Sequence, residues 1–222
     1  MSSPQDRRPI RAREAGWAQR GARALQQRGF TPNQISVASI GFALLAAVFW
    51  FGGTLISSAW LSGLFLLLTA IAIQGRLICN LLDGMVAVEG GMTSPEGPIY
   101  NDLPDRISDS LILVGLGYAL SQFPHAQALG WAAALGAAMT AYVRVLGGSC
   151  GLPQRFSGPM AKQHRMALLT VAALLAIALP QWRQEILLAA LWIITLGTIV
   201  TTALRTLAVT QQLRERASHE QE

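Results

Sequence analysis

Long apolar segments separated by short polar connections follow one another along most of the chain. Each approaches the roughly 20 residues that a helix needs to cross the hydrocarbon core of a membrane, although charges interrupt the start of the third. We therefore predict an all-α integral membrane protein with six transmembrane helices. The segments lie at about residues 34–53, 58–79, 107–122, 127–147, 165–179 and 186–204.

The first 30 residues are polar and rich in arginine, and they carry Ile10, Trp17 and Ala24 at seven-residue spacing. This pattern predicts an N-terminal helix lying in the interface of an anionic leaflet, with a disordered basic arm as the alternative. Thr31 and Pro32 then predict the start of the first transmembrane helix. The chain divides into a juxtamembrane segment (1–30), a membrane domain (31–209) and a tail (210–222).

The composition excludes an ordinary soluble domain, because 52% of the 222 residues are hydrophobic and only 13% are charged. The net charge of +5 comes from basic residues that cluster before the first segment, around the connection at 148–164 and after the last segment. By the positive-inside rule, both termini and the connections at 80–106 and 148–164 are cytoplasmic. We expect a bacterial-type inner membrane protein that does not bind nucleic acid, since the basic residues are spread over membrane-flanking loops.

Acidic residues are concentrated in one place. Between Ala15 and Arg214 the chain has seven of them, and six lie between residues 83 and 109. Carboxylates at the edge of an apolar segment are costly unless they are paired or bind a cation, so these residues are functional candidates.

The spacing of these residues predicts two facing rows of polar side chains. Asn80 and Asp83 share one helix face, and Asn101, Asp105 and Asp109 recur every fourth residue on the next helix. Helices joined by a short loop are antiparallel neighbours, so the two rows can converge. Carboxylate and amide oxygens suit Mg²⁺ or Mn²⁺ and do not suit zinc.

Three further features leave alternatives open. The small residues Gly84 and Ala87 allow either a flat nucleotide base or a neighbouring helix to approach. Arg76 either extends to lipid headgroups or points inward at an anionic ligand. The basic residues near the connection at 148–164 either bind phosphate groups or only set the topology; they are Arg144, Lys162, His164 and Arg165.

The acidic stretch resembles the signature of the CDP-alcohol phosphatidyltransferases, D-x2-D-G-x2-A-R-x8-G-x3-D-x3-D. Every spacing is kept, and with six spans and Thr-Pro-Asn before the first of them the resemblance covers most of the chain. The matching positions are Asn80, Asp83, Gly84, Ala87, Val88, Gly97, Asn101 and Asp105.

The resemblance implies a membrane enzyme that transfers a phosphatidyl group from CDP-diacylglycerol to an alcohol such as glycerol 3-phosphate and releases CMP. Asp105 would be the general base and, with Asn80, Asp83 and Asn101, a ligand of two divalent cations. Gly84, Ala87 and Gly97 would line the nucleotide site, whereas Arg144, Lys162, His164 and Arg165 would contact the acceptor. A homodimer is also implied.

The sequence departs from this signature at three positions. Asn80 and Asn101 replace aspartates, and Val88 replaces the arginine, so the site loses two formal negative charges. Asp102 and Asp109 are candidates for restoring that charge. The alternative function is a non-catalytic protein that binds a CDP-lipid or a lipid headgroup as a sensor or assembly partner.

Overall fold

The structure, a computed structural model, describes residues 15–154 and 156–219, and its regular elements there are all helical. The predicted all-α fold is therefore confirmed over this part of the chain. The elements are α1 (Gly16–Gln27), α2 (Pro32–Leu55), α3 (Ala59–Glu89), α4 (Gly97–Ala119), α5 (Ala126–Ser149), α6 (Lys162–Ala178), the short 3₁₀ helix η3 (Pro180–Trp182) and α7 (Arg183–His219).

The six predicted apolar segments correspond to the six helices α2 to α7, in order. Among the described residues, four helices are long and apolar enough to cross a membrane, namely α2, α3, α5 and the helix that includes α7. The helix α6 has only 17 residues, and α4 carries several charged residues over its first half. Several apolar helices thus indicate a multi-pass membrane protein with four candidate spans among the described residues, and the predicted count of six is not confirmed.

The start of α2 follows the prediction from Thr31 and Pro32. The hydroxyl of Thr31 accepts a hydrogen bond from the backbone N–H of Gln34 at 3.3 Å, and the Gln34 side chain accepts one from the Thr31 N–H at 3.0 Å. This reciprocal capping box satisfies backbone groups that a helix start leaves unpaired. It fixes where α2 enters the bundle.

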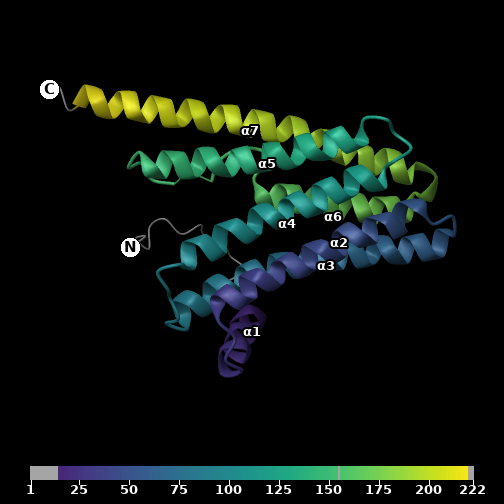
Figure 1. Cartoon of the computed structure of the whole chain (residues 1–222), viewed down its shortest axis with the longest axis horizontal. Coiled ribbons are helices and arrows are strands. Elements are labelled where there is room, and N and C mark those ends of the chain that lie inside the picture. Colours follow the sequence, from purple (N-terminus) through teal and green to yellow (C-terminus); the bar gives the residue numbers. More distant parts are fainter. Residues whose placement is uncertain (1–14, 155, 220–222) are drawn as a thin grey trace.

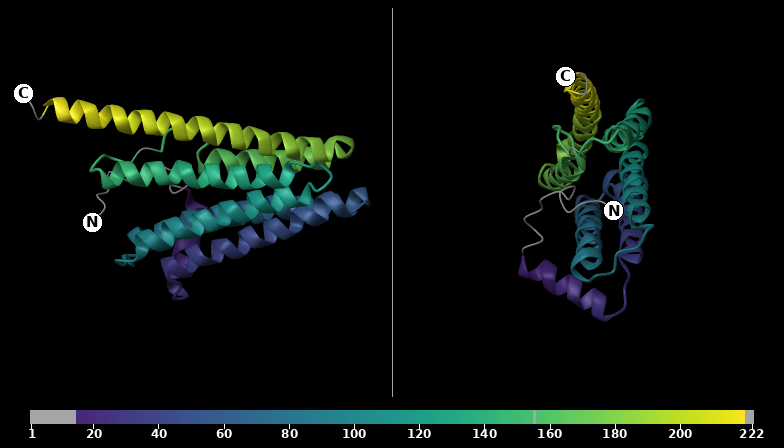
Figure 2. Two further views of the ribbon diagram at one scale, coloured as in Figure 1. Left: turned by 45° about the horizontal axis from the view of Figure 1, so that its top comes forward. Right: turned by 90° about the vertical axis from the view of Figure 1, so that its left-hand side faces the viewer.

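The helices α2 to α7 run roughly side by side, whereas α1 crosses one end of the bundle (Figure 1). The helix α2 packs against α3 and α4, α5 packs against α4 and α7, and α6 packs against α3 and α7 (Figure 2). The C-terminal half of α3 and the N-terminal halves of α4 and α6 therefore meet at one end. This is the end on which the predicted functional residues lie.

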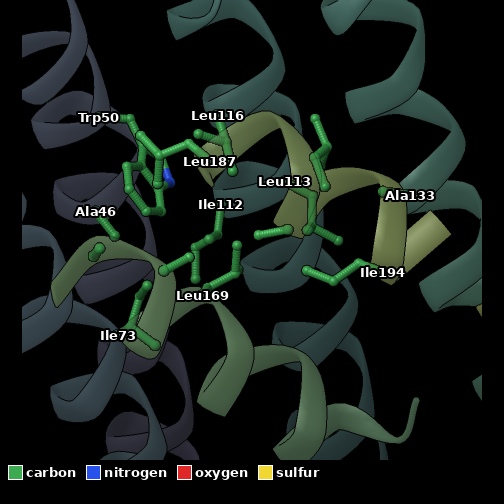
Figure 3. Packing of buried hydrophobic residues seen from close by; sticks show 14 of the residues in the cluster. Ala46, Trp50, Ile73, Ile112, Leu113, Leu116, Ala133, Leu169, Leu187 and Ile194 are labelled. Carbon is green, nitrogen blue, oxygen red and sulfur yellow. The ribbon is translucent and has the colours of Figure 1, made fainter. Parts of the chain in front are cut away.

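A continuous apolar core joins α2 to α7 (Figure 3), with Trp50, Ile112 and Leu169 fully buried in it. Where α4 crosses α5, Gly117 and Gly130 allow close backbone approach. A Cβ atom on Gly117 would lie 2.6 Å from the carbonyl oxygen of Ala126 and 2.9 Å from the Cα of Gly130. Small residues at such crossings are typical of membrane helix packing.

The outer surface of the bundle is apolar as well. Large hydrophobic side chains are exposed along α2, α3, α5 and α7, for example Val48, Ile71, Leu135 and Ile199. A surface of this kind suits lipid as the surrounding solvent.

A helix, α1, is present over the described part of the N-terminal segment, and its position in the membrane interface stays a prediction. Ala18 and Ala22 of α1 are buried against α3, while Trp17 remains 48% exposed. Gln26 ties α1 to the end of α3 by donating to the carbonyl oxygen of Gly90 at 3.2 Å. The other predicted interfacial residue at this spacing, Ile10, lies outside the described residues.

Candidate functional site

Asp105 of α4 is the centre of the candidate site. It is buried, and its carboxylate accepts a hydrogen bond from the Asn80 amide of α3 at 2.6 Å. The ammonium group of Lys162, at the start of α6, lies 2.5 Å from the other carboxylate oxygen. Arg76 of α3 and Arg106 complete its ion pairs, at 3.2 Å and 3.5 Å. Three helices thus converge on one carboxylate, and the two predicted rows meet where Asn80 bonds Asp105.

Asp109, one helical turn after Asp105, is held between two arginines. Its carboxylate oxygens lie 2.7 Å from Arg76 and 2.6 Å from Arg165. Both guanidinium groups are almost fully buried, and Arg165 also donates to the carbonyl oxygen of Met160 at 2.8 Å. Of the two alternatives for Arg76, the structure selects the inward one. Arg165, which we predicted as an acceptor contact, is instead a buried partner of Asp109.

Asp83 is the second buried carboxylate of the signature. The hydroxyl of Ser36 in α2 donates to it at 2.5 Å, and Ser39 in turn donates to the carbonyl oxygen of Ser36 at 2.6 Å. The sequence analysis did not identify Ser36 as a site residue. The available signal was weak: two serines, three residues apart, on an otherwise apolar helix.

The remaining predicted residues lie outside this network. Asp102 pairs with Arg144 at 2.6 Å, and Arg144 also bonds Gln154 and lies 5.1 Å from the ring centroid of Phe156. Among the described residues, Asn101 and His164 are exposed and do not join the contacts of Asp105 or Asp109. Asp102 and Asp109 are each paired with arginine, so neither adds uncompensated negative charge.

The predicted nucleotide-binding residues are accessible, but none of them lines the hollow found at this end. Gly84, Ala87 and Gly97 are all partly exposed, and Val88 is 54% exposed. Between the starts of α2 and α4 is a hollow of about 320 Å³, lined by Asn33, Gln34, Val37, Glu96 and Tyr100. This volume lies at the lower end of the range of ligand pockets, about 300–1,000 Å³.

The donor atoms at this site suit one hard dication. Asp83 and Asp105 offer carboxylate oxygens, which hard cations prefer. Asn80 offers its amide oxygen, because its amide nitrogen already donates to Asp105. Over residues 15–154 and 156–219, however, no group of three or more His, Cys, Asp or Glu side chains is arranged to hold a metal ion. The carboxylates of Asp105 and Asp109 are instead paired with basic side chains.

Solved structures of phosphatidylinositol phosphate synthase from Mycobacterium tuberculosis share this architecture. The structure in complex with manganese and citrate is 19% identical over 86% of this chain and 88% of that chain, with a TM-score of 0.70. The structure with CDP-DAG bound is 19% identical, covers 88% and 94% of the two chains, and has a TM-score of 0.72. The apo structure is 18% identical, covers 86% of this chain and 95% of that chain, and has a TM-score of 0.66.

No family model and no curated protein sequence matches the chain. At 19% identity the structural likeness establishes the fold, whereas the activity has to be argued from the site. The helical bundle anticipated from the signature is therefore confirmed: the chain has the fold of a phosphatidylinositol phosphate synthase, a CDP-alcohol phosphatidyltransferase.

Proposed function

We propose that the chain is a membrane phosphotransferase that moves a phosphatidyl or related phospho-alcohol group from a CDP-activated lipid to an alcohol, with release of CMP. The observation that carries this proposal is the 2.6 Å hydrogen bond between Asn80 and Asp105. It joins the two halves of the signature, on α3 and α4, into one site. The manganese-bound and CDP-DAG-bound neighbours of the same fold support the substrate class and a Mg²⁺ or Mn²⁺ cofactor.

In the reaction we propose, the acceptor hydroxyl oxygen attacks the phosphorus that bears the lipid. The bond from that phosphorus to the bridging oxygen of CMP breaks, and its electron pair leaves with CMP. The hydroxyl proton passes to the Asp105 carboxylate, which acts as the general base. A bound dication, held by Asp83, Asp105 and Asn80, would neutralise the diphosphate of the donor.

Lys162 links acceptor binding to this base. Its ammonium group occupies an oxygen of Asp105, and its side chain is 25% exposed, so it can reach an incoming anion. An acceptor phosphate would draw Lys162 away and leave that oxygen free to take the proton. Arg144 is a second candidate for the acceptor, being 13% exposed beside the loop at 150–161. A phosphorylated acceptor such as glycerol 3-phosphate is therefore our preferred substrate.

The nucleotide would occupy the open end between α2 and α4, with Gly84, Ala87 and Gly97 near its base. We place this end and both termini on the cytoplasmic side of a bacterial-type inner membrane, with α4 and α6 as two spans in addition to the four helices that are long and apolar enough to cross it. There a lipid-embedded donor and a soluble acceptor can meet. A homodimer remains part of this proposal.

The test is CMP release by the purified protein with CDP-diacylglycerol and Mg²⁺ or Mn²⁺ over a panel of alcohol acceptors. We expect release that depends on one class of acceptor and is lost in Asp83→Ala. CDP-diacylglycerol binding without release for any acceptor would favour the sensor function instead, which the close pairing of Asp105 with Lys162 would then explain.

A further inference from the structure

Both oxygens of the Asp105 carboxylate are already occupied. Its Oδ1 atom accepts a hydrogen bond from the Asn80 amide at 2.6 Å and lies 3.2 Å from Arg76. Its Oδ2 atom lies 2.5 Å from the ammonium nitrogen of Lys162 and 3.5 Å from Arg106. A general base has to come within about 2.6–3.2 Å of the hydroxyl that it serves. Asp105 can therefore serve a hydroxyl only after one of these partners has moved away.

The two oxygens differ in how firmly they are held. Oδ1 faces α3, where Asn80 and the fully buried Arg76 contact it. Oδ2 contacts Lys162, whose side chain is 25% exposed, whereas Arg106 lies beyond the usual hydrogen-bond distance of about 2.7–3.2 Å. Lys162 is the first residue of α6, and its four-carbon stem is flexible. Lys162 is thus the close partner that can leave Asp105 without disturbing the helix packing.

The residue type at this position is also distinctive. Of the 17 lysine and arginine residues in the chain, Lys162 is the single lysine. Arginine holds a carboxylate through a planar group with several donors, as Arg76 and Arg165 hold the buried Asp109. Lysine offers one compact and strongly hydrated ammonium group. The chain therefore has arginine where a buried carboxylate is held permanently, and lysine where the contact with a carboxylate can be released.

We propose that Lys162 determines that an alcohol, and not water, attacks the CDP-lipid. The inference rests on the proposed function and concerns the same site. Without an acceptor, the ammonium group covers the Oδ2 atom of Asp105, so a water molecule beside the donor is not activated. A phosphorylated acceptor attracts the ammonium group to its phosphate and frees this oxygen as its own hydroxyl arrives. The donor is thereby protected from hydrolysis until the acceptor is bound.

A second activity follows from this arrangement. Inorganic phosphate brings the anion without an alcohol, so it should release Lys162 and leave water as the nucleophile. The water oxygen would attack the phosphorus that bears the lipid, and the bond from that phosphorus to the bridging oxygen of CMP would break. One proton of the water would pass to Asp105, and the electron pair would leave with CMP. The products would be phosphatidic acid and CMP.

The experiment measures phosphatidic acid and CMP formed from CDP-diacylglycerol by the purified full-length protein, with Mg²⁺ and without any alcohol acceptor. For the wild type, we expect inorganic phosphate to raise hydrolysis at least about tenfold, because an available general base contributes about 10²–10⁴-fold. This measurement requires no variant. Hydrolysis that inorganic phosphate leaves unchanged would overturn the inference.

Two variants separate the charge of Lys162 from its release. Lys162→Met should hydrolyse CDP-diacylglycerol without phosphate, and added phosphate should have no further effect. Lys162→Arg keeps the charge but holds Asp105 through several donors, so kcat for transfer should fall more than KM for the acceptor rises, and phosphate should not induce hydrolysis. Arg214→Lys, on the exposed tail of α7, is the matched control. Wild-type behaviour of Lys162→Arg would overturn the inference.

Failure of the proposed function has a different signature. In that case no alcohol acceptor gives CMP from CDP-diacylglycerol, and inorganic phosphate gives none either. If only the role of Lys162 is wrong, the wild type transfers to its acceptor, whereas phosphate does not induce hydrolysis.

Discussion

Asp105 receives more polar contacts than any other side chain named in this site, and its surroundings define its role. Asn80, Lys162 and Arg76 hold its two oxygens from two other helices. A carboxylate held in this way is oriented before substrate arrives. We expect Asp105→Asn to lower turnover about 10²–10⁴-fold, the usual contribution of a general base.

The measurement for Asp105→Asn is acceptor-dependent CMP release, with thermal unfolding in detergent as the control for folding. Asparagine has the same shape and Arg76 keeps its bond to Asp109, so the fold should be retained. Turnover close to wild type in this variant would remove Asp105 as the base.

Also at the residue scale, the proposed role of Lys162 in acceptor binding can be tested. We expect Lys162→Ala to raise KM for a phosphorylated acceptor more than it changes the affinity for CDP-diacylglycerol, because the partly exposed ammonium group is lost. Steady-state kinetics with each substrate varied in turn measure this. Arg214→Ala, on the exposed tail of α7, is the control. An effect on the lipid donor alone would show that the acceptor site lies elsewhere.

The sequence predicted the residues of the signature but not all of their partners. The three-residue spacing of Asn80 and Asp83 put them on one face of α3, and the short connection to α4 predicted that Asp105 would approach that face. The inward direction of Arg76 depends on the carboxylate of Asp105, 29 residues away in the sequence. Ser36 contacts the carboxylate of Asp83, 47 residues away. Such pairings follow from how helices pack, which local pattern does not determine.

At the scale of elements, the buried pair of Asp109 and Arg165 joins α4 to α6. We expect Arg165→Met to destabilise the protein by about 3–5 kcal/mol, because it removes one partner of a buried charge. Arg144→Met is the matched control: the Asp102–Arg144 pair is partly exposed, and losing it should cost no more than about 1 kcal/mol.

Thermal unfolding of the two variants in the same detergent compares these pairs. Equal losses of stability would contradict the assignment of Arg165 to a structural pair. It would also return Arg165 to the role of acceptor contact that the sequence alone indicated.

Helix positions were predictable, whereas helix lengths were not. Apolar segments near 20 residues located α2 to α7, but α3 continues to Glu89 and α7 continues to His219. At 1.5 Å per residue, the 37 residues of α7 extend about 55 Å, well beyond a hydrocarbon core of about 30 Å. Polar residues continue a helix whenever propensity allows, so hydropathy marks the membrane part and not the helix end.

At the scale of the whole molecule, six spans require the two ends of α5 to lie on opposite sides of the membrane. Cys150 follows α5 on the predicted cytoplasmic side and is exposed, and Ser121 lies in the connection on the other side. We expect a membrane-impermeant maleimide to reach Ser121→Cys in intact cells, in a Cys79→Ala, Cys150→Ala background. Wild-type Cys150 should react only after the membrane is opened; the reverse pattern would contradict this topology.

The central claim is that the bond between the lipid-bearing phosphorus and CMP is the one that breaks. The most direct measurement uses CDP-diacylglycerol labelled with ³²P at that phosphorus, with the purified protein, a dication and an acceptor alcohol. We expect the label to appear in a new phospholipid containing the acceptor and the released CMP to be unlabelled, with both products lost in Asp83→Ala. Label released in a water-soluble product, or no acceptor in the lipid, would contradict it.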